Sequence, residues 1–159
     1  FYNSSDVSDF DRPLSKKGIL NAKKIKEYIR KEKILIDFVA CSSSKRTFET
    51  FLIIKPSLKN IKLLKCDELY TFNETKLIKQ IYKFSNKFEN ILIIGHNPAI
   101  HDTVLNLTNK NINENKINLI NEKFPTSCLA IVEFKIKEWK QLEGNSGTLK
   151  EVVFSKELF

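Results

Sequence analysis

Apolar residues along this chain fall into two alternating patterns. Short continuous apolar runs are typical of buried strands, and longer segments with apolar residues three or four apart are typical of amphipathic helices. Strands are expected over residues 36–41, 61–65, 91–94, 127–135 and 148–154. Helices are expected over residues 16–32, 45–54, 74–88 and 98–108.

The order of these elements predicts the fold class. Alternating strands and helices are typical of a three-layer α/β/α sandwich with a mostly parallel central sheet. A turn at 143–147 between the last two strands predicts an antiparallel hairpin at the edge of that sheet. Residues 109–122 are polar, and we expect a surface insert there with one short amphipathic turn around 117–120. No repeat or linker is visible, so residues 1–159 are expected to form a single domain.

The run Ile91–Ile94 and the residues after it predict the centre of the sheet. Four aliphatic residues in a row indicate a strand covered on both faces, Gly95 ends it, and Pro98 can open a helix. His96 then lies at the carboxyl edge of the sheet, where open α/β sheets bind ligands and helix N-termini favour anions. His96 is either structural or functional. His101 lies about 140° further around the helix, so we expect no paired metal site and place His101 at the surface or rim.

Two arginines are candidates for binding an anion. Arg46 begins a predicted helix directly after Ser42–Ser44, and a guanidinium can bind phosphate oxygens with two parallel hydrogen bonds. Arg46 could equally be an exposed residue at the start of that helix. Arg12 is ambiguous in the same way, and for it we favour an ion pair with Asp9 or Asp11 that fixes the loop.

Composition narrows the class of protein. The 159 residues, 42% of them hydrophobic, suffice for a folded core, and no apolar run approaches the roughly 20 residues of a membrane span. The net charge is +8, but the lysines are scattered and arginines are few, unlike a nucleic-acid-binding surface. The three cysteines lack metal-ligand spacing and are expected to be free thiols. We therefore expect a cytoplasmic protein with no metal, no cofactor, no nucleic acid and no membrane as partner.

Several segments, taken in order, resemble the histidine phosphatase superfamily, and within it the short SixA-type phosphohistidine phosphatases. The matching segments are 9–18, 42–50, 68–70, 95–101 and 124–127, which together span nearly the whole chain. The resemblance implies a phosphoglycerate mutase-like fold. It also implies that Arg46 is the second phosphate-clamping arginine and His96 the second histidine of the catalytic pocket, with Arg12 and Asn97 as substrate-binding candidates.

The family's first strand ends in an Arg-His motif that supplies the nucleophilic histidine and the first arginine. We expect this motif upstream of Phe1, so that the domain in residues 1–159 lacks its first strand. The implied mechanism is covalent and needs no metal: a neutral imidazole attacks phosphorus, and water hydrolyses the resulting phosphohistidine. Arg46, His96 and the upstream arginine would stabilise charge on the phosphoryl oxygens.

The leaving group narrows the expected substrate, a phosphorylated protein or a small phosphorylated molecule. Asp67 and Glu68 are the candidate acids after strand 61–65, and no lid is inserted there. Imidazole protonates near pH 6.5 and needs little help to leave, which favours protein phosphohistidine. Two alternatives stay open: a broader small-molecule phosphomonoesterase with Glu68 as its acid, and a non-catalytic module that binds phosphate or a phosphoprotein.

Overall fold

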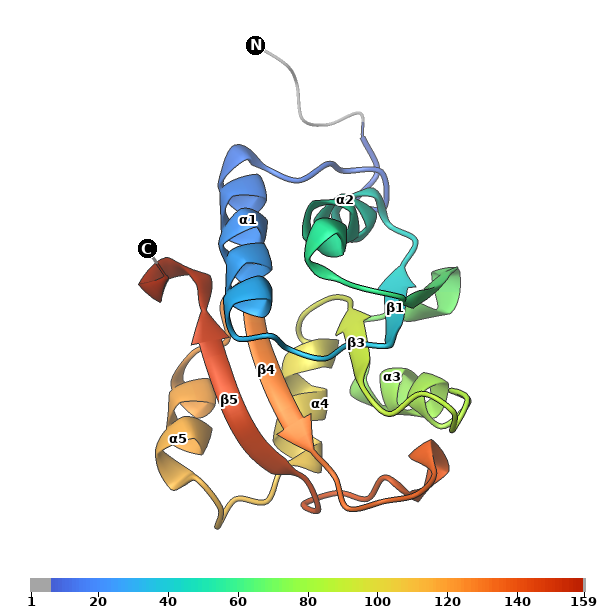
Figure 1. Ribbon diagram of the computed structural model, residues 1–159, viewed down its shortest axis with the longest axis vertical. Coiled ribbons are helices and arrows are strands. Elements are labelled where there is room, and N and C mark those ends of the chain that lie inside the picture. The colour runs from blue at the N-terminus through green and yellow to red at the C-terminus, as the bar shows by residue number, and fades with distance from the viewer. Residues whose placement is uncertain (1–6, 159) are drawn as a thin grey trace.

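Strand β1 (Phe38–Ser42) lies at the centre of a three-stranded parallel sheet with the order β2-β1-β3. The computed structural model describes residues 7–158, and Figure 1 shows their elements along the chain. The helices are α1 (Lys16–Lys31), α2 (Lys45–Ile54), α3 (Glu74–Ile81), α4 (Ala99–Leu107) and α5 (Glu114–Glu122). The remaining strands are β2 (Lys62–Cys66), β3 (Ile91–Ile94), β4 (Cys128–Glu133) and β5 (Thr148–Phe154).

The two faces of β1 belong to different parts of the core. Phe38 and Ala40 pack into the cluster that α3 and α4 contribute to, whereas Val39 and Cys41 pack with Phe51 of α2. Successive side chains of a strand point to opposite faces. A strand with apolar residues on both faces therefore needs helices on both sides, which is why this sequence builds a layered fold.

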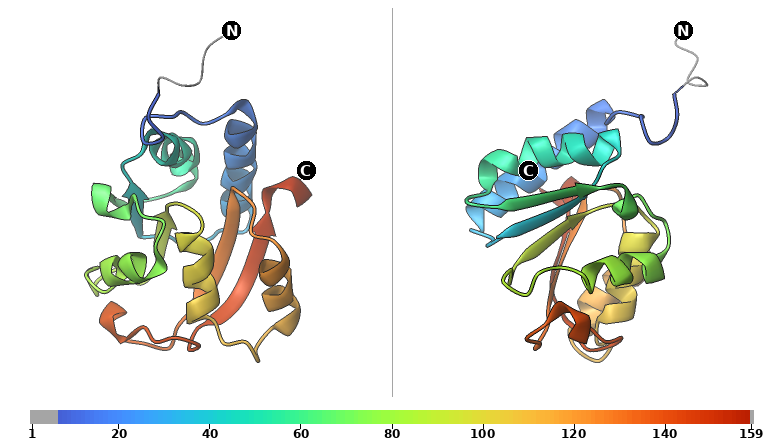
Figure 2. Two further views of the ribbon diagram at one scale, coloured as in Figure 1. Left: turned by 180° about the vertical axis from the view of Figure 1, so that it is seen from behind. Right: turned by 90° about the vertical axis from the view of Figure 1, so that its right-hand side faces the viewer.

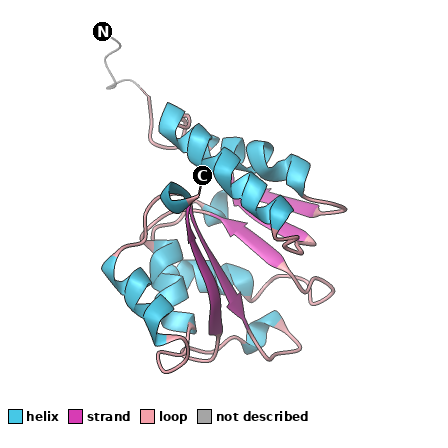
Figure 3. Ribbon diagram, turned by 60° about the vertical axis from the view of Figure 1, so that its left-hand side comes forward, coloured by secondary structure: helices cyan, strands magenta, loops and turns pink. Residues whose placement is uncertain are grey.

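Helices α1 and α2 lie on one side of the parallel strands and α3 and α4 on the other, as the right-hand view of Figure 2 shows. Strands β4 and β5 form an antiparallel hairpin beside this sheet, and α5 covers the hairpin (Figure 3). Ile117 and Ile120 of α5 pack there against Leu149 of β5. The predicted α/β/α class, with a mostly parallel sheet and an antiparallel hairpin, is confirmed.

Some predicted boundaries are wrong in detail. Helix α3 ends at Ile81 rather than Phe88, because the chain continues there in short i→i+3 turns. Residues 109–122 hold the complete helix α5 rather than one short turn, because its two buried isoleucines have a partner surface on the hairpin. Among the described strands, the hairpin is a separate two-stranded sheet and does not hydrogen-bond to the parallel one.

Side-chain caps fix where the helices near the sheet edge begin. The Ser15 hydroxyl accepts a hydrogen bond from the Gly18 N–H at 3.0 Å and caps α1, as the sequence predicts. Asn73 caps α3 in the same way through a 3.0 Å bond from the Lys76 N–H. Within residues 7–158, no helix is long and apolar enough to cross a membrane.

Candidate active site

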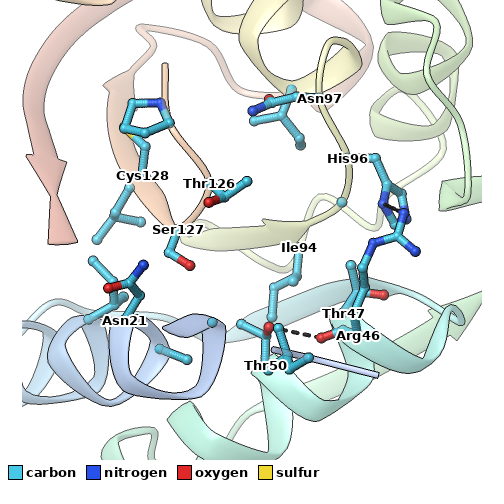
Figure 4. Close-up of a pocket in the computed structure, with 18 of the residues that line it drawn as sticks. Asn21, Arg46, Thr47, Thr50, Ile94, His96, Asn97, Thr126, Ser127 and Cys128 are labelled. Atoms are coloured by element: carbon cyan, nitrogen blue, oxygen red, sulfur yellow. Dashed lines mark hydrogen bonds between the residues drawn. The ribbon is translucent and has the colours of Figure 1, made fainter. Parts of the chain in front are cut away.

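The carboxyl ends of β1 and β3 lie side by side and bring two predicted site residues together. Strand β1 leads through Ser43 and Ser44 into α2, whose first turn carries Arg46, and β3 leads through Gly95 to His96. Nη2 of Arg46 lies 3.0 Å from Nδ1 of His96, although the two residues are 50 positions apart. Figure 4 shows Arg46 reaching the histidine ring from α2.

His96 is only 6% exposed, and both of its ring nitrogens are hydrogen-bonded. A guanidinium group can only donate, so Nδ1 accepts from Arg46 and the ring proton is on Nε2. Nε2 donates to the Ser42 hydroxyl at 2.8 Å. Burial, together with the charge of Arg46, lowers the pKa of His96 to about 4. The neutral ring therefore positions Arg46 in this arrangement and has no proton free to donate to an anion.

The anion that Arg46 binds in this structure is Asp9. Nη1 of Arg46 donates to the backbone carbonyl of Asp9 at 2.7 Å, and Nη2 donates to Oδ2 at 3.0 Å. The Tyr70 hydroxyl donates to the same Oδ2 at 2.6 Å, and Arg12 donates to Oδ1 at 2.9 Å. The bonds from Tyr70 and Arg12, and the charge of Arg46, hold the pKa of Asp9 well below its usual range. The predicted ion pair of Arg12 with Asp9 or Asp11 is formed with Asp9, whereas the contact between Asp9 and Arg46 was not predicted.

A buried hydroxyl network holds the turn from which Arg46 projects. The Thr47 hydroxyl donates to the Ser42 carbonyl at 2.8 Å and lies 2.6 Å from the Ser44 hydroxyl. Both serines are completely buried. The bond between Ser42 and His96 was not predicted. The available signal was a hydroxyl at the end of a buried strand, next to the edge where His96 was expected.

Asn97 and His101 hold the segment 124–127 against α4. The Asn97 side-chain amide donates to the Phe124 carbonyl at 3.2 Å. The His101 ring stacks on the Phe124 ring with 4.8 Å between centroids, and its Nε2 donates to the Ile120 carbonyl at 2.7 Å. His101 is half-buried and does not line the cavity itself. It supports the segment 124–127, which lines the side of the cavity opposite Arg46 (Figure 4).

A cavity of about 640 Å³ extends from Arg46 and His96 down between β3 and β4. Its mouth is polar and its inner walls are apolar, with Ile25 and Ile29 of α1 facing Leu129 of β4. A second cavity, of about 280 Å³, lies between the same two strands. Among the described strands, β3 pairs only with β1 and β4 only with β5, so their other edges face this space.

Glu68, the candidate acid, does not line this cavity. Its carboxylate lies near the Cys66 thiol. Burial is the main cause that raises the pKa of this thiol, and the nearby charge of Glu68 also raises it. Of the described residues on the cavity wall, Asp9 alone carries a carboxylate. No group of three or more His, Cys, Asp or Glu side chains within the described part of the chain could hold a metal ion.

No family model matches this sequence. An uncharacterized protein of Mycobacterium leprae is 29% identical over 143 residues, which cover 90% of this chain and 86% of the relative. A structure described as the "putative phosphohistidine phosphatase SixA" from Nakamurella multipartitia has a TM-score of 0.80 and 22% identity. The match covers 94% of this chain and 88% of that one. The protein histidine phosphatase SixA complexed with tungstate has a TM-score of 0.74 and 18% identity, with 97% and 91% of the two chains covered.

These similarities establish the class of fold. The chain has the histidine phosphatase fold, and the resemblance expected from its motifs is confirmed at that level. Within this class, its structural neighbours include the SixA-type proteins, which are also similar in size, since most of each chain is matched.

Proposed function

We propose that this protein is a metal-independent phosphatase that acts through a phosphohistidine intermediate, with protein phosphohistidine as its substrate class. The observation that carries the proposal is the Arg46 guanidinium, held by a neutral His96 at the carboxyl edge of the parallel sheet. The fold adds support, because one structural neighbour is named as a complex with tungstate, a tetrahedral oxyanion like phosphate. In the proposed complex, phosphoryl oxygens replace the Asp9 carboxylate on Arg46 and Arg12.

We propose further that the nucleophile is a histidine on a strand upstream of Phe1, and that this strand completes the domain in residues 1–159. The facing edges of β3 and β4 support this, because a strand placed between them would pair with the free backbone groups of both. A strand parallel to β3 would end at the edge where His96 and Arg46 lie. Its last residue would then be beside the bound phosphoryl group.

The proposed reaction has two steps. In the first, a ring nitrogen of the nucleophile bonds to phosphorus, the bond from phosphorus to the leaving imidazole breaks, and that imidazole takes a proton from solvent. In the second, a water oxygen bonds to phosphorus, the bond to the nucleophile breaks, and orthophosphate and a proton are released. Arg46 and Arg12 offset the negative charge that builds on the phosphoryl oxygens in both steps.

The preference for a nitrogen leaving group is supported by the carboxylates near the site. In this structure the bonds from Tyr70 and Arg12 hold the pKa of Asp9 well below its usual range. A carboxylate displaced from the arginines into water is still ionised at neutral pH, so Asp9 has no proton to donate. Glu68 does not line the cavity. An alkoxide leaving group needs an acid, whereas imidazole accepts a proton near neutral pH. The described site therefore suits N–P bonds better than O–P bonds.

The test is phosphate release from phosphoimidazole by the natural full-length protein and three variants. Arg46→Ala and His96→Ala should each lower kcat/KM about 100-fold or more, as expected when a charged donor or its positioning partner is lost. Lys45→Ala is the matched control, because Lys45 is the exposed cation next to Arg46 and does not line the cavity. Loss of less than about fivefold in both site variants, or an equal loss in the control, would contradict the proposal.

A further inference from the structure

Three aromatic rings form a connected group that contacts His96 through two of its members, Tyr70 and Phe72. Tyr70 packs edge-on against both Phe10 and His96, with 5.0 Å between centroids in each pair. Phe72 lies 5.4 Å from the Tyr70 ring and 5.4 Å from the His96 ring. The hydroxyl of Tyr70 is bonded to Asp9, which leaves Phe72 as the purely apolar ring nearest to His96.

Phe72 differs from its two neighbours because 47% of it is exposed while it also lines the cavity of Arg46 and His96. An exposed ring that also lines a polar site is available to contact a molecule bound there. The ring is also held in place from both sides. Tyr70 is fixed by its bond to Asp9, and Asn73 caps α3 and donates its backbone N–H to Thr71 at 3.2 Å.

We propose that Phe72 is a specificity-determining residue that binds a planar ring attached to the phosphoryl group. The inference rests on the proposed function, since it takes the phosphoryl group to lie on Arg46. A ring bonded to that phosphorus extends toward the mouth, where the open part of Phe72 can stack against it. Aromatic pairs of this kind strengthen binding about twofold to tenfold beyond the burial of their area.

This subsite defines a substrate class within phosphoramidates. Phosphorylated imidazole, as in phosphohistidine, carries a planar ring directly on the phosphorus–nitrogen bond. Phosphoramidate has the same kind of bond and no ring. The contact with Phe72 should therefore favour phosphorylated imidazole over phosphoramidate, whereas Arg46 should bind the phosphoryl groups of both compounds equally.

The experiment compares phosphoimidazole with phosphoramidate as substrates of the natural full-length protein and its variants. Phe72→Leu should lower kcat/KM for phosphoimidazole about threefold to tenfold and leave phosphoramidate within about twofold. Phe72→Trp keeps a ring and should retain the preference. Tyr82→Leu is the matched control, because Tyr82 is a similarly exposed aromatic residue of 40% exposure that does not line the cavity.

The possible outcomes separate the two proposals. If the wild-type protein hydrolyses both compounds and Phe72→Leu changes both equally or changes neither, the ring subsite is wrong and the phosphatase assignment stands. If the wild-type protein hydrolyses neither compound, the proposed function fails and the subsite fails with it. A selective loss on phosphoimidazole that Phe72→Trp restores supports the subsite.

Discussion

Acidification should destabilise this protein because His96 must stay neutral in the folded state. Its pKa is lowered to about 4 by burial and by Arg46, whereas an unfolded histidine has a pKa of about 6.5. Between these two values the unfolded chain binds more protons than the folded chain. The free energy of unfolding therefore falls as the pH falls through this window, and the contribution of His96 is complete above about pH 7.

The size of the effect follows from the two pKa values. The full difference corresponds to about 3 kcal/mol, and about 2 kcal/mol of it should be lost between pH 7 and pH 5. Solvent screens this pKa difference little, because the ring is 6% exposed and both nitrogens are hydrogen-bonded inside the protein. A loss of this size is a large part of the 5–15 kcal/mol that is typical of folded domains.

The assay is urea unfolding followed by circular dichroism at pH 7, 6 and 5. Wild-type protein should lose stability across this range, and His96→Gln should show a much flatter dependence because the titrating ring is gone. The chain contains two histidines, which provides the control: His101→Gln keeps His96 and should keep the wild-type slope. An equal slope in wild type and His96→Gln would refute the reasoning.

Three further predictions follow from individual contacts. Gly147→Ala would place a Cβ 2.5 Å from the Phe134 ring and should lower the free energy of unfolding, measured by thermal denaturation, by about 1–3 kcal/mol. Gly144→Ala is the control and should lower it little, because its Cβ would meet its nearest atom at 3.4 Å. Glu68→Gln should change kcat/KM on aryl phosphates by less than about twofold, and a large loss would favour the phosphomonoesterase alternative. Asn97→Ala removes the bond to the segment lining the cavity and should raise KM more than it lowers kcat, as steady-state kinetics can show.

The spacing of apolar residues predicts the strands and the first helices of this fold, because within each of these elements it indicates which side is buried. Strand β1 is apolar on both faces, and both faces are covered in the structure. Helix α5 shows the limit, since it has only two buried apolar residues in an Asn- and Lys-rich segment. Its stability comes from packing on β5, which lies some thirty positions later and could not be read from the segment itself.

Some residues of the site could likewise be predicted from the sequence, and others could not. Arg46 and His96 each follow a strand of one parallel sheet, and neighbouring parallel strands end at the same edge, so their proximity could be predicted. The loop that carries Asp9 has no periodicity, and its contacts reach residues 37 and 61 positions away. Phe72 likewise lies in a loop, and only the three-dimensional arrangement places its exposed ring at the cavity.

The central claim is that Arg46, held in position by a neutral His96, binds a phosphoryl group. The most direct measurement is the nitrogen NMR spectrum of the His96 ring while orthophosphate is added to the protein. The account predicts a neutral ring with its proton on Nε2, a shift of the Nδ1 signal as phosphate engages Arg46, and no such shift in Arg46→Ala. A Nδ1 signal that stays unchanged up to saturating phosphate, or that shifts equally in Arg46→Ala, would contradict it.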